Sequence, residues 1–470
     1  MTDHDFVLRE AFDQARRFLA GLRERPVGGR ASLEELRAAL GGPLPEEGVD
    51  PRRVVEELAR GAERGLVASA GPRYFGFVVG GSLPAALGAD WLASAWDQNG
   101  GLYVLAPAAA VVEDVATTWL LDLLGLPKGC SVGFVTGCQM ANYTGLIAAR
   151  HAVLRREGWD VEEAGLRNAP PVHVVVGAQV HVTVLTALRM LGLGSRDVTR
   201  VDADDQGRMR PDALHRVVGA LDGPLIVCAQ AGDVNSGAFD PFVEILDLLR
   251  GRNAWLHVDG AFGLWAAASP ERRHMLKGVE GADSWATDAH KWLNVPYDCG
   301  LAIVKDPAAH RAPFAAGAAY LVQTQGPERD PHDFTPEFSR RARGFAVYAA
   351  LRSLGRRGVA DLVERLCLRA RQMADRLGRD SDVRILNDVV LNQVLVRFEA
   401  PAGDADGFTR AVIARVQRDG TCWLGGTRWR GQQAMRVSVS NWSTTEEDID
   451  RSADAILAAA RAESDIQGRS

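Results

Sequence analysis

Short apolar runs alternate with amphipathic stretches through the middle of the chain. The runs are four to six residues long and lie at 172–177, 225–230, 254–259 and 301–304. They are partly β-branched, are bounded by Gly, Asp or Pro, and are separated by stretches with helical spacing of apolar positions. Buried parallel strands joined by helices have this pattern, because helices cover both faces of such a sheet. The pattern therefore predicts a doubly wound α/β sheet within residues 72–310.

The two ends of the chain have other patterns. Residues 1–71 hold amphipathic helical stretches without a strand of their own, as in an arm that packs on a larger body or on a second subunit. Residues 311–470 begin with a polar loop and continue with helices and strand candidates at 393–398 and 434–440. The sequence therefore predicts three parts: a helical N-terminal arm (1–71), a large α/β domain (72–310), and a mobile loop with a small α+β domain (311–470).

Composition excludes several classes of protein. Of the 470 residues, 47% are hydrophobic and 24% charged, which is typical of a soluble globular protein rather than a disordered one. The net charge of −6 argues against nucleic acid or an anionic membrane as a partner. No apolar run approaches the roughly 18 residues of a membrane span. The first residues lack the layout of a signal peptide, so a cytoplasmic location is expected.

Cysteine and lysine are both informative. The six cysteines form no C-x-x-C pair, so no zinc or thioredoxin-type site is predicted, and we expect reduced, mostly buried thiols. Lysine occurs only at positions 128, 277, 291 and 305. Chemistry that needs a lysine amine therefore has four candidates.

Two charged residues follow predicted strands, at the edge where open α/β sheets bind ligands. Asp259 ends the run 254–259. Lys291, between His290 and Trp292, comes after the weakly strand-like run 283–287. A carboxylate at a buried strand end needs a partner, and desolvation lowers the pKa of an amine, which favours an imine with an aldehyde. A helix N-cap or a structural ion pair also explains Asp259, and a snorkelling surface side chain also explains Lys291.

Three further features fall at the same predicted edge. Residues 134–150 are a turn of small residues that opens into a helix, whose N-terminus favours a phosphate, although both Gly-rich nucleotide motifs are absent. His181 and Asn235 each follow another strand. A plain turn, a capping histidine and a turn asparagine are the structural alternatives. Together with Asp259 and Lys291, the set describes a pyridoxal phosphate (PLP) site, in which a carboxylate keeps the pyridine nitrogen protonated.

On these residues the chain resembles the group II PLP-dependent amino-acid decarboxylases, relatives of the aromatic-L-amino-acid, glutamate and tyrosine decarboxylases. The resemblance runs from residues 73–99 to 436–450, and its most specific parts are HVDGAFG (257–263), DAHKWLNVPYDCG (288–300) and His181, 78 positions before Asp259. It implies the aspartate-aminotransferase-like fold type I of PLP-dependent transferases, with a mainly parallel seven-stranded sheet. It also implies a homodimer with active sites at the interface, and a substrate pocket lined by residues 73–83.

The resemblance further implies a role for each candidate residue. Lys291 would form the Schiff base with the cofactor, and Asp259 would bind the pyridinium nitrogen. His181 would stack on the ring and assist proton transfer, with Ala261 on the other face. The other cofactor-binding positions implied are Cys138 (through its backbone) and Gln139 at the phosphate, Asp288 and His290 beside the phosphate, and Asn235 near the cofactor hydroxyl.

Two positions depart from the family pattern. Asp288 stands where many relatives have Asn, and an anion beside a phosphate is unfavourable unless it points away or is bonded to donors. Many relatives also place in a mobile loop a tyrosine that protonates the carbanion, but residues 321–347 contain no tyrosine. Phe334 is nearest to the expected place and His332 is close by, so His332, His181 and water are the candidate proton donors. In this superfamily, loss of that hydroxyl is associated with aldehyde-forming oxidative chemistry.

The sequence thus predicts a PLP-dependent carboxy-lyase that releases carbon dioxide and an amine from an L-amino acid, which it does not identify. One alternative is the same cofactor with another outcome: aldehyde-forming oxidative decarboxylation, transamination or carbon–carbon bond cleavage. A catalytically silent PLP-fold binding protein is a second alternative, and a Schiff-base aldolase without PLP is a third.

Overall fold

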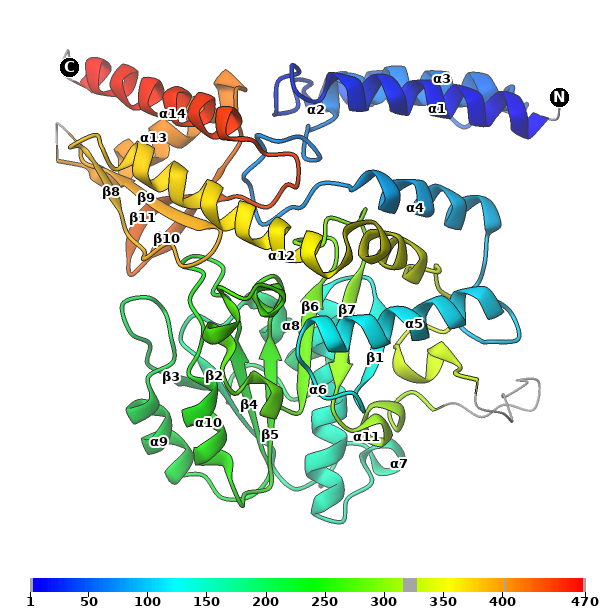
Figure 1. The fold of residues 1–470 in the computed structure, drawn as a ribbon, viewed down its shortest axis with the longest axis vertical. Coiled ribbons are helices and arrows are strands. Elements are labelled where there is room, and N and C mark those ends of the chain that lie inside the picture. Colours follow the sequence, from blue (N-terminus) through cyan, green and yellow to red (C-terminus); the bar gives the residue numbers. More distant parts are fainter. Residues whose placement is uncertain (1–2, 316–327, 401–402, 468–470) are drawn as a thin grey trace. The chain divides into compact units, whose positions relative to one another are not determined.

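Two compact units make up the computed structural model, which describes residues 3–315, 328–400 and 403–467. Unit 1 comprises the chain up to Val79 together with 372–386 and the chain from Leu395, and unit 2 comprises 80–371 and 387–394. Unit 1 therefore holds both ends of the chain, and unit 2 holds the large sheet (Figure 1). The division of the chain at residues 71 and 310 stays a prediction, because these units follow contacts rather than chain order.

A seven-stranded sheet forms the centre of unit 2, in the order β1-β7-β6-β5-β4-β2-β3 (Figure 1). β7 is antiparallel to β1 and β6, and the other pairs are parallel. The strands are β1 (Ser131–Val135), β2 (His173–Gly177), β3 (Thr199–Val201), β4 (Leu225–Gln230), β5 (Ala254–Asp259), β6 (Ser284–Asp288) and β7 (Gly300–Val304). The predicted α/β class and the mainly parallel sheet are confirmed.

The apolar pattern predicted the bounds of some strands correctly and missed other strands. β4 and β5 have the predicted bounds, and β2 and β7 differ from them by one residue. β6 lies one residue beyond the weakly strand-like run 283–287, and the pattern missed β1 and β3. β1 is buried throughout, but its SVGFV sequence includes Gly and Ser and runs into a turn of small residues. β3 is a three-residue strand at the edge of the sheet, too short to show a period.

Helices of unit 2 cover the sheet. One core cluster joins α6, α8 and α11 to the sheet through side chains such as Leu146, Val176, Leu188 and Ile226. The α-helices that lie within this unit are α4 (Pro84–Trp96), α5 (Pro107–Leu123), α6 (Cys138–Arg156), α7 (Val161–Ala164), α8 (Val182–Met190), α9 (Pro211–Gly219), α10 (Phe242–Leu249) and α11 (Pro307–Arg311). Short 3₁₀ helices are η2 (Gly263–Ala268), η3 (Arg273–Leu276), η4 (Val279–Gly281) and η5 (Pro331–Phe334).

One long helix, α12 (Gly344–Leu377), continues through a break and is shared by the two units. Its break is at Gly355, where φ is +61°, a backbone conformation that glycine adopts without steric cost. The two helical stretches that the sequence predicts here, at 345–358 and 360–378, are therefore one element with a kink.

Unit 1 contains a four-stranded sheet in the order β10-β11-β9-β8. Its strands are β8 (Val383–Ile385), β9 (Gln393–Phe398), β10 (Gly425–Trp429) and β11 (Gln432–Ser438). Its helices are α1 (Asp3–Gly21), α2 (Leu33–Leu40), α3 (Pro51–Ala62), η1 (Glu63–Gly65), α13 (Ala405–Asp419) and α14 (Glu446–Gln467). α2 begins with a reciprocal capping box between Ser32 and Glu35, and α3 begins with Asp50 as N-cap and Pro51 in the first turn, so local sequence sets both starts.

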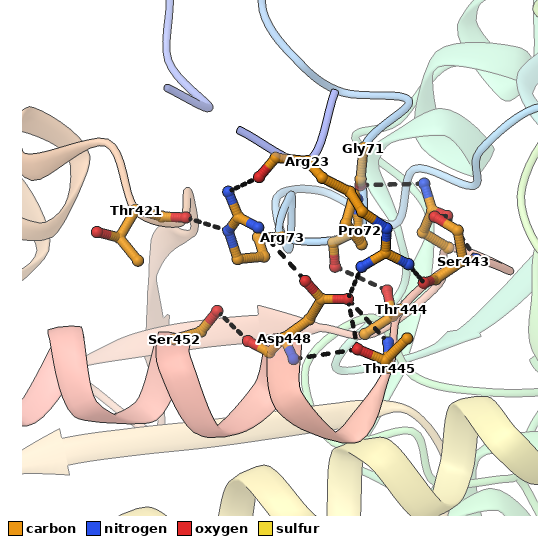
Figure 2. Close-up of polar contacts among 11 residues, drawn as sticks. Arg23, Gly71, Pro72, Arg73, Thr421, Ser443, Thr444, Thr445, Asp448 and Ser452 are labelled. Carbon is orange, nitrogen blue, oxygen red and sulfur yellow. Dashed lines mark hydrogen bonds and ion pairs between the residues drawn. The ribbon is translucent and has the colours of Figure 1, made fainter. Parts of the chain in front are cut away.

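A buried ion pair ties the N-terminal segment to the C-terminal helix within unit 1 (Figure 2). Arg73 and Asp448 are almost fully buried, with Nη1 and Oδ1 3.3 Å apart. Arg73 also donates to the carbonyl oxygens of Thr421 and Arg23, at 2.7 and 2.6 Å. Asp448 Oδ2 accepts from the backbone and hydroxyl of Thr445. Both charges are thus bonded on several sides, as a buried pair requires.

Residues 3–315, 328–400 and 403–467 contain neither a membrane-spanning helix nor a metal-ligand cluster. No helix there is both long and apolar enough to cross a bilayer. No group of three or more His, Cys, Asp or Glu side chains in the same ranges is arranged to hold a metal ion.

Candidate active site

Most of the predicted site residues lie where strands of the large sheet end. Asp259 is the last residue of β5 and Asp288 the last of β6, three positions before Lys291. Cys138 is the first residue of α6, which follows β1, and His181 is the N-cap of α8, which follows β2. β2, β5 and β6 run in the same direction, so their carboxyl ends share one edge of the sheet.

Lys291 is paired with a carboxylate. Its Nζ lies 2.8 Å from Asp288 Oδ2, and its side chain is 21% exposed. Burial lowers the pKa of the Lys291 amine. The negative charges of Asp288 and Asp259 raise that pKa by more than burial lowers it, so the net pKa is above the ordinary lysine value. Desolvation does lower this pKa, as the sequence predicts, but in the cofactor-free protein the nearby carboxylates, which the sequence did not place, outweigh burial.

Asp288 is bonded to donors on several sides. Its Oδ1 accepts a 2.6 Å hydrogen bond from the backbone N–H of Cys138 and lies 3.4 Å from Nε2 of His290. Its Oδ2 faces Lys291. The carboxylate, only 2% exposed, is thus compensated on both oxygens, which meets the condition for an anion at this position.

The orientation of His290 follows from its neighbours. Its Nδ1 accepts a 3.1 Å hydrogen bond from the backbone N–H of Cys299, so the ring proton is on Nε2, toward Asp288. The ring stacks on Tyr297 with centroids 4.3 Å apart. Burial lowers the pKa of His290, so a neutral ring is favoured.

The N-terminus of α6 retains the donors that a phosphate needs. Asp288 takes the N–H of Cys138, and the N–H of Ala141 bonds to the carbonyl of Gly137. Within the described ranges, no acceptor faces the N–H groups of Gln139 and Met140. The residues therefore fit a phosphate group at Gln139 and Met140 rather than at Cys138. The sequence analysis missed Met140, although the first three N–H groups of any helix lack intrahelical partners.

Asp259 is held by three donors. Its Oδ2 accepts from Asn142 Nδ2 at 3.2 Å, and its Oδ1 accepts from the backbone N–H of Ala261 at 3.2 Å and from the thiol of Cys138 at 3.5 Å. Burial, and then the nearby charge of Asp259, raise the pKa of the Cys138 thiol well above its ordinary value, so the thiol keeps its proton. The carbonyl of Ala261 accepts from the N–H of Asp288, which joins the ends of β5 and β6.

His181 caps α8. Its Nδ1 accepts from the backbone N–H of Thr183 at 3.4 Å and lies 2.8 Å from the Thr183 hydroxyl oxygen. Because Nδ1 accepts, Nε2 carries the ring proton. The hydroxyl of Thr183 in turn accepts from Asn142 Nδ2 at 3.3 Å. The capping role that the sequence left open is therefore present, and the stacking role stays a prediction.

Two other candidates have different surroundings. Asn235 lies in the loop between β4 and α10, where its backbone N–H donates to Asp233. His332 lies in η5, where its ring packs on Phe338 at 4.8 Å and its backbone N–H donates to Gly101. None of the hydrogen bonds or ring contacts that His332 makes within the described ranges reaches Lys291. The roles of Asn235 and His332 stay predictions, and residues 316–327 of the predicted mobile loop lie outside the described residues.

The structure adds residues that the sequence analysis did not select. Asn142 lies one turn after Cys138 on the same helix, and His257 lies two residues before Asp259 on β5, so each shares a face with a selected residue. A buried asparagine on an apolar helix face was the available signal. Its contacts, to residues 41, 115 and 117 positions away, were not visible in the sequence.

Known proteins resemble this chain over most of its length. A sequence profile described as the pyridoxal-dependent decarboxylase conserved domain matches residues 34–399. L-2,4-diaminobutyrate decarboxylase of Rhizobium meliloti is 30% identical over 428 residues, which cover 89% of this chain and 84% of that protein. Aromatic-L-amino-acid decarboxylase of Bacillus atrophaeus is 28% identical over 439 residues, with 91% and 89% covered. A crystal structure of Oryza sativa TDC with PLP and tryptamine has a TM-score of 0.91 at 24% identity, with 98% of each chain covered, and is evidence for the fold.

Proposed function

The chain belongs to the pyridoxal-dependent decarboxylase family, and we propose that Lys291 and Asp259 bind the pyridoxal phosphate with which it releases carbon dioxide from an L-amino acid. The observation that carries this proposal is the hydrogen-bonded cluster at one edge of the large sheet. There a lysine, a buried carboxylate and an open helix N-terminus are joined through Asp288, Cys138 and Asn142.

Each part of the cluster suits one part of the cofactor. Pyridoxal phosphate, when bound, supplies an electron sink for the electron pair that the departing carboxylate leaves behind. Asp259, bonded on both oxygens, favours a proton on a pyridine nitrogen beside it. The N–H groups of Gln139 and Met140 suit the phosphate, and the Lys291 amine suits the aldehyde carbon.

Lys291 and His181 each hold a proton whose position is set by a neighbouring side chain. Asp288 holds a proton on Lys291 Nζ in the free protein, so the amine must lose that proton before it reacts. His181 has its proton on Nε2, because Thr183 occupies Nδ1. We assign His181 as the donor of a proton to the substrate carbon, with His332 as the alternative donor from the loop that lacks tyrosine.

Borohydride trapping and a substrate panel test this proposal. The protein loaded with pyridoxal phosphate is reduced and digested, and mass spectrometry is expected to find the pyridoxyl group on Lys291. The same loaded protein, incubated with single L-amino acids, is expected to release carbon dioxide with at least one of them. K291A is the control for attachment and activity. A label at another lysine, or silence across the panel, would contradict the proposal.

A second outcome of the same chemistry is supported by the missing tyrosine between residues 321 and 347. In that case the amino acid, dioxygen and water give an aldehyde, carbon dioxide, ammonia and hydrogen peroxide. Measuring amine, aldehyde and peroxide in one reaction separates the two outcomes. Amine equal to carbon dioxide favours simple decarboxylation, and aldehyde with peroxide favours the oxidative route.

We also propose that the chain forms a homodimer. Large apolar side chains are exposed on α1 and α3 of unit 1, namely Phe6, Leu8, Phe12, Leu19, Val54 and Leu58. In unit 2, Trp91, Leu92 and Trp96 of α4 are exposed as well. Apolar surface of this extent is typical of a face that another subunit covers. Light scattering coupled to gel filtration is expected to give twice the chain mass of 50.7 kDa.

A cytoplasmic location is part of the same proposal. All six cysteines are free and buried, which suits a compartment that keeps thiols reduced. Fractionation of cells that produce the protein tests this location.

A further inference from the structure

We propose that Asn142 is a positioning residue that orients both Asp259 and His181, the two side chains proposed to face the cofactor ring. This inference rests on the proposed function. Asn142 is fully buried on α6, and its amide makes three hydrogen bonds. Nδ2 donates to Asp259 Oδ2 at 3.2 Å and to Thr183 Oγ1 at 3.3 Å, and Oδ1 accepts from His257 Nε2 at 2.9 Å.

The direction of each bond is determined by chemistry. An ionised carboxylate only accepts, so the NH₂ group of Asn142 must face Asp259 and its carbonyl oxygen must face His257. His257 Nε2 must therefore carry the ring proton. Burial lowers the pKa of His257 to about 4, which favours the neutral ring with a single proton.

Two further residues hold His257 in that tautomer. His257 Nδ1 lies 2.8 Å from Ser284 Oγ, and the indole N–H of Trp255 donates to the same oxygen at 2.8 Å. Because the indole only donates, the Ser284 hydroxyl proton is available for His257 Nδ1. Trp255, Ser284, His257 and Asn142 thus form one chain of donated hydrogen bonds that ends at Asp259, and all four are almost fully buried.

The second N–H of Asn142 determines the other branch. Thr183 Oγ1 accepts from Asn142, so its own proton is free to point at His181 Nδ1, 2.8 Å away. This bond leaves the His181 proton on Nε2. One buried amide therefore donates to Asp259 and favours a single tautomer of His181 at the same time.

The decisive variant is Asn142→Leu, which keeps the approximate size of the side chain and removes all three bonds. The protein is loaded with pyridoxal phosphate labelled with ¹⁵N in the ring, and the ¹⁵N chemical shift reports protonation of that nitrogen. We expect the wild-type shift of a protonated ring and, in N142L at the same pH, a shift toward the unprotonated form. We expect kcat to fall about tenfold to a hundredfold, the effect of losing hydrogen bonds to a charged group, while KM changes little.

Two single variants test separately the hydrogen bonds that lead from Asn142 to Asp259 and those that lead through Thr183 to His181. They also provide the test if N142L does not fold. Ser284→Ala removes the proton donor to His257 Nδ1 and so weakens the tautomer that holds the Asn142 NH₂ group on Asp259; the ring-nitrogen shift should move in the same direction as in N142L, but by less. Thr183→Val leaves the Asp259 branch intact, so it should lower kcat without moving that shift. Thr117→Val is the matched control: this buried threonine of α5 bonds to no group in the described ranges, and its variant should retain both wild-type values.

The outcomes distinguish this inference from the function on which it rests. Wild-type shift and kcat in N142L, or equal effects of S284A and T183V on the shift, would overturn the positioning role. Failure of the wild-type protein to take up the cofactor would overturn both. In the cofactor-free protein, ¹⁵N spectra of labelled histidine should place the His257 proton on Nε2, and S284A should change that tautomer; a wild-type proton on Nδ1 would overturn the network alone.

Discussion

Lys291 Nζ lies 2.8 Å from Asp288 Oδ2. In the cofactor-free protein, the lysine proposed to bind the cofactor is therefore in an ion pair with Asp288. The other oxygen of Asp288 caps α6 at Cys138. Asp288 therefore links the strand that leads to Lys291 with the helix whose N-terminus suits the phosphate.

Asp288→Asn is expected to make the protein load pyridoxal phosphate at lower pH. The Asp288 charge raises the pKa of the Lys291 amine, so its removal lowers that pKa and leaves more neutral amine at any given pH. Loading rates measured from pH 6 to 9 by borohydride trapping should show the rate profile of D288N at lower pH than that of the wild type. Asp298→Asn, which removes a carboxylate paired with Arg343, is the control and should leave the profile unchanged.

Gly80→Ala is expected to disturb the Lys291 loop. A Cβ at Gly80 would lie 2.0 Å from the backbone oxygen of Lys291 and 3.0 Å from that of His290, closer than atoms approach. The variant should unfold at a lower temperature and bind pyridoxal phosphate more weakly, as thermal unfolding and a binding titration will show. Gly88→Ala in α4, where nothing lies within 4 Å, should be as stable as the wild type or slightly more stable, because alanine favours helix.

Arg340→Met is expected to lower the free energy of unfolding by about 3–5 kcal/mol. Arg340 and Glu113 are each 1% exposed and bonded through two oxygens at 2.8 and 2.7 Å, and Arg340 also donates to the carbonyl of Phe134 in β1. Loss of the arginine leaves a buried carboxylate without its partner charge. Urea unfolding measures the effect, and the double variant Glu113→Leu/Arg340→Met should be more stable than R340M alone. Equal stability of the two would contradict the explanation.

His310→Gln is expected to make the protein less sensitive to acid. Burial, and then the charge of Arg329, lower the pKa of His310 to about 3. Because this folded-state pKa is below the unfolded value of about 6.5, the stabilising contribution is complete above pH 6.5 and is lost as the pH falls toward 3. Between pH 6.5 and 5 the wild type should lose about 1–2 kcal/mol more stability than H310Q.

The comparison with H310Q isolates this histidine. Burial raises the pKa of Asp240 to about 6, so its contribution has the opposite sign, but it is present in both proteins and cancels. Glutamine can keep the hydrogen bond that His310 makes to Ser131 at 2.8 Å. Urea midpoints at several pH values measure the difference, and parallel curves for the two proteins would contradict the assignment.

Local sequence was sufficient for most strands of the large sheet, but not for β1 and β3, and it selected candidate residues for the site. Continuous apolar runs identify strands buried on both faces, and β4 and β5 begin and end where the pattern predicts. Asp259 was selected because a charge at the end of such a run is costly without a partner, and Lys291 because it lies beside bulky aromatic residues; the roles of both stay predictions. Met140 was not selected although the helix start was recognised, because the phosphate contact proposed for it involves its backbone rather than its side chain.

The amino-acid sequence alone determined the class of fold, the bounds of β4 and β5, and the selection of Lys291 and Asp259 as candidates, since these depend on side-chain polarity at short spacing. Only the tertiary structure decided that Asn142 connects Asp259, Thr183 and His257, and that Asp288 raises the Lys291 pKa that burial alone would lower. Hydrogen bonds and charge interactions act across a few ångströms, between residues that can be more than 100 positions apart in the chain. The periodicity of apolar positions does not show which distant residues come into contact, so these partners could be identified only in the folded structure.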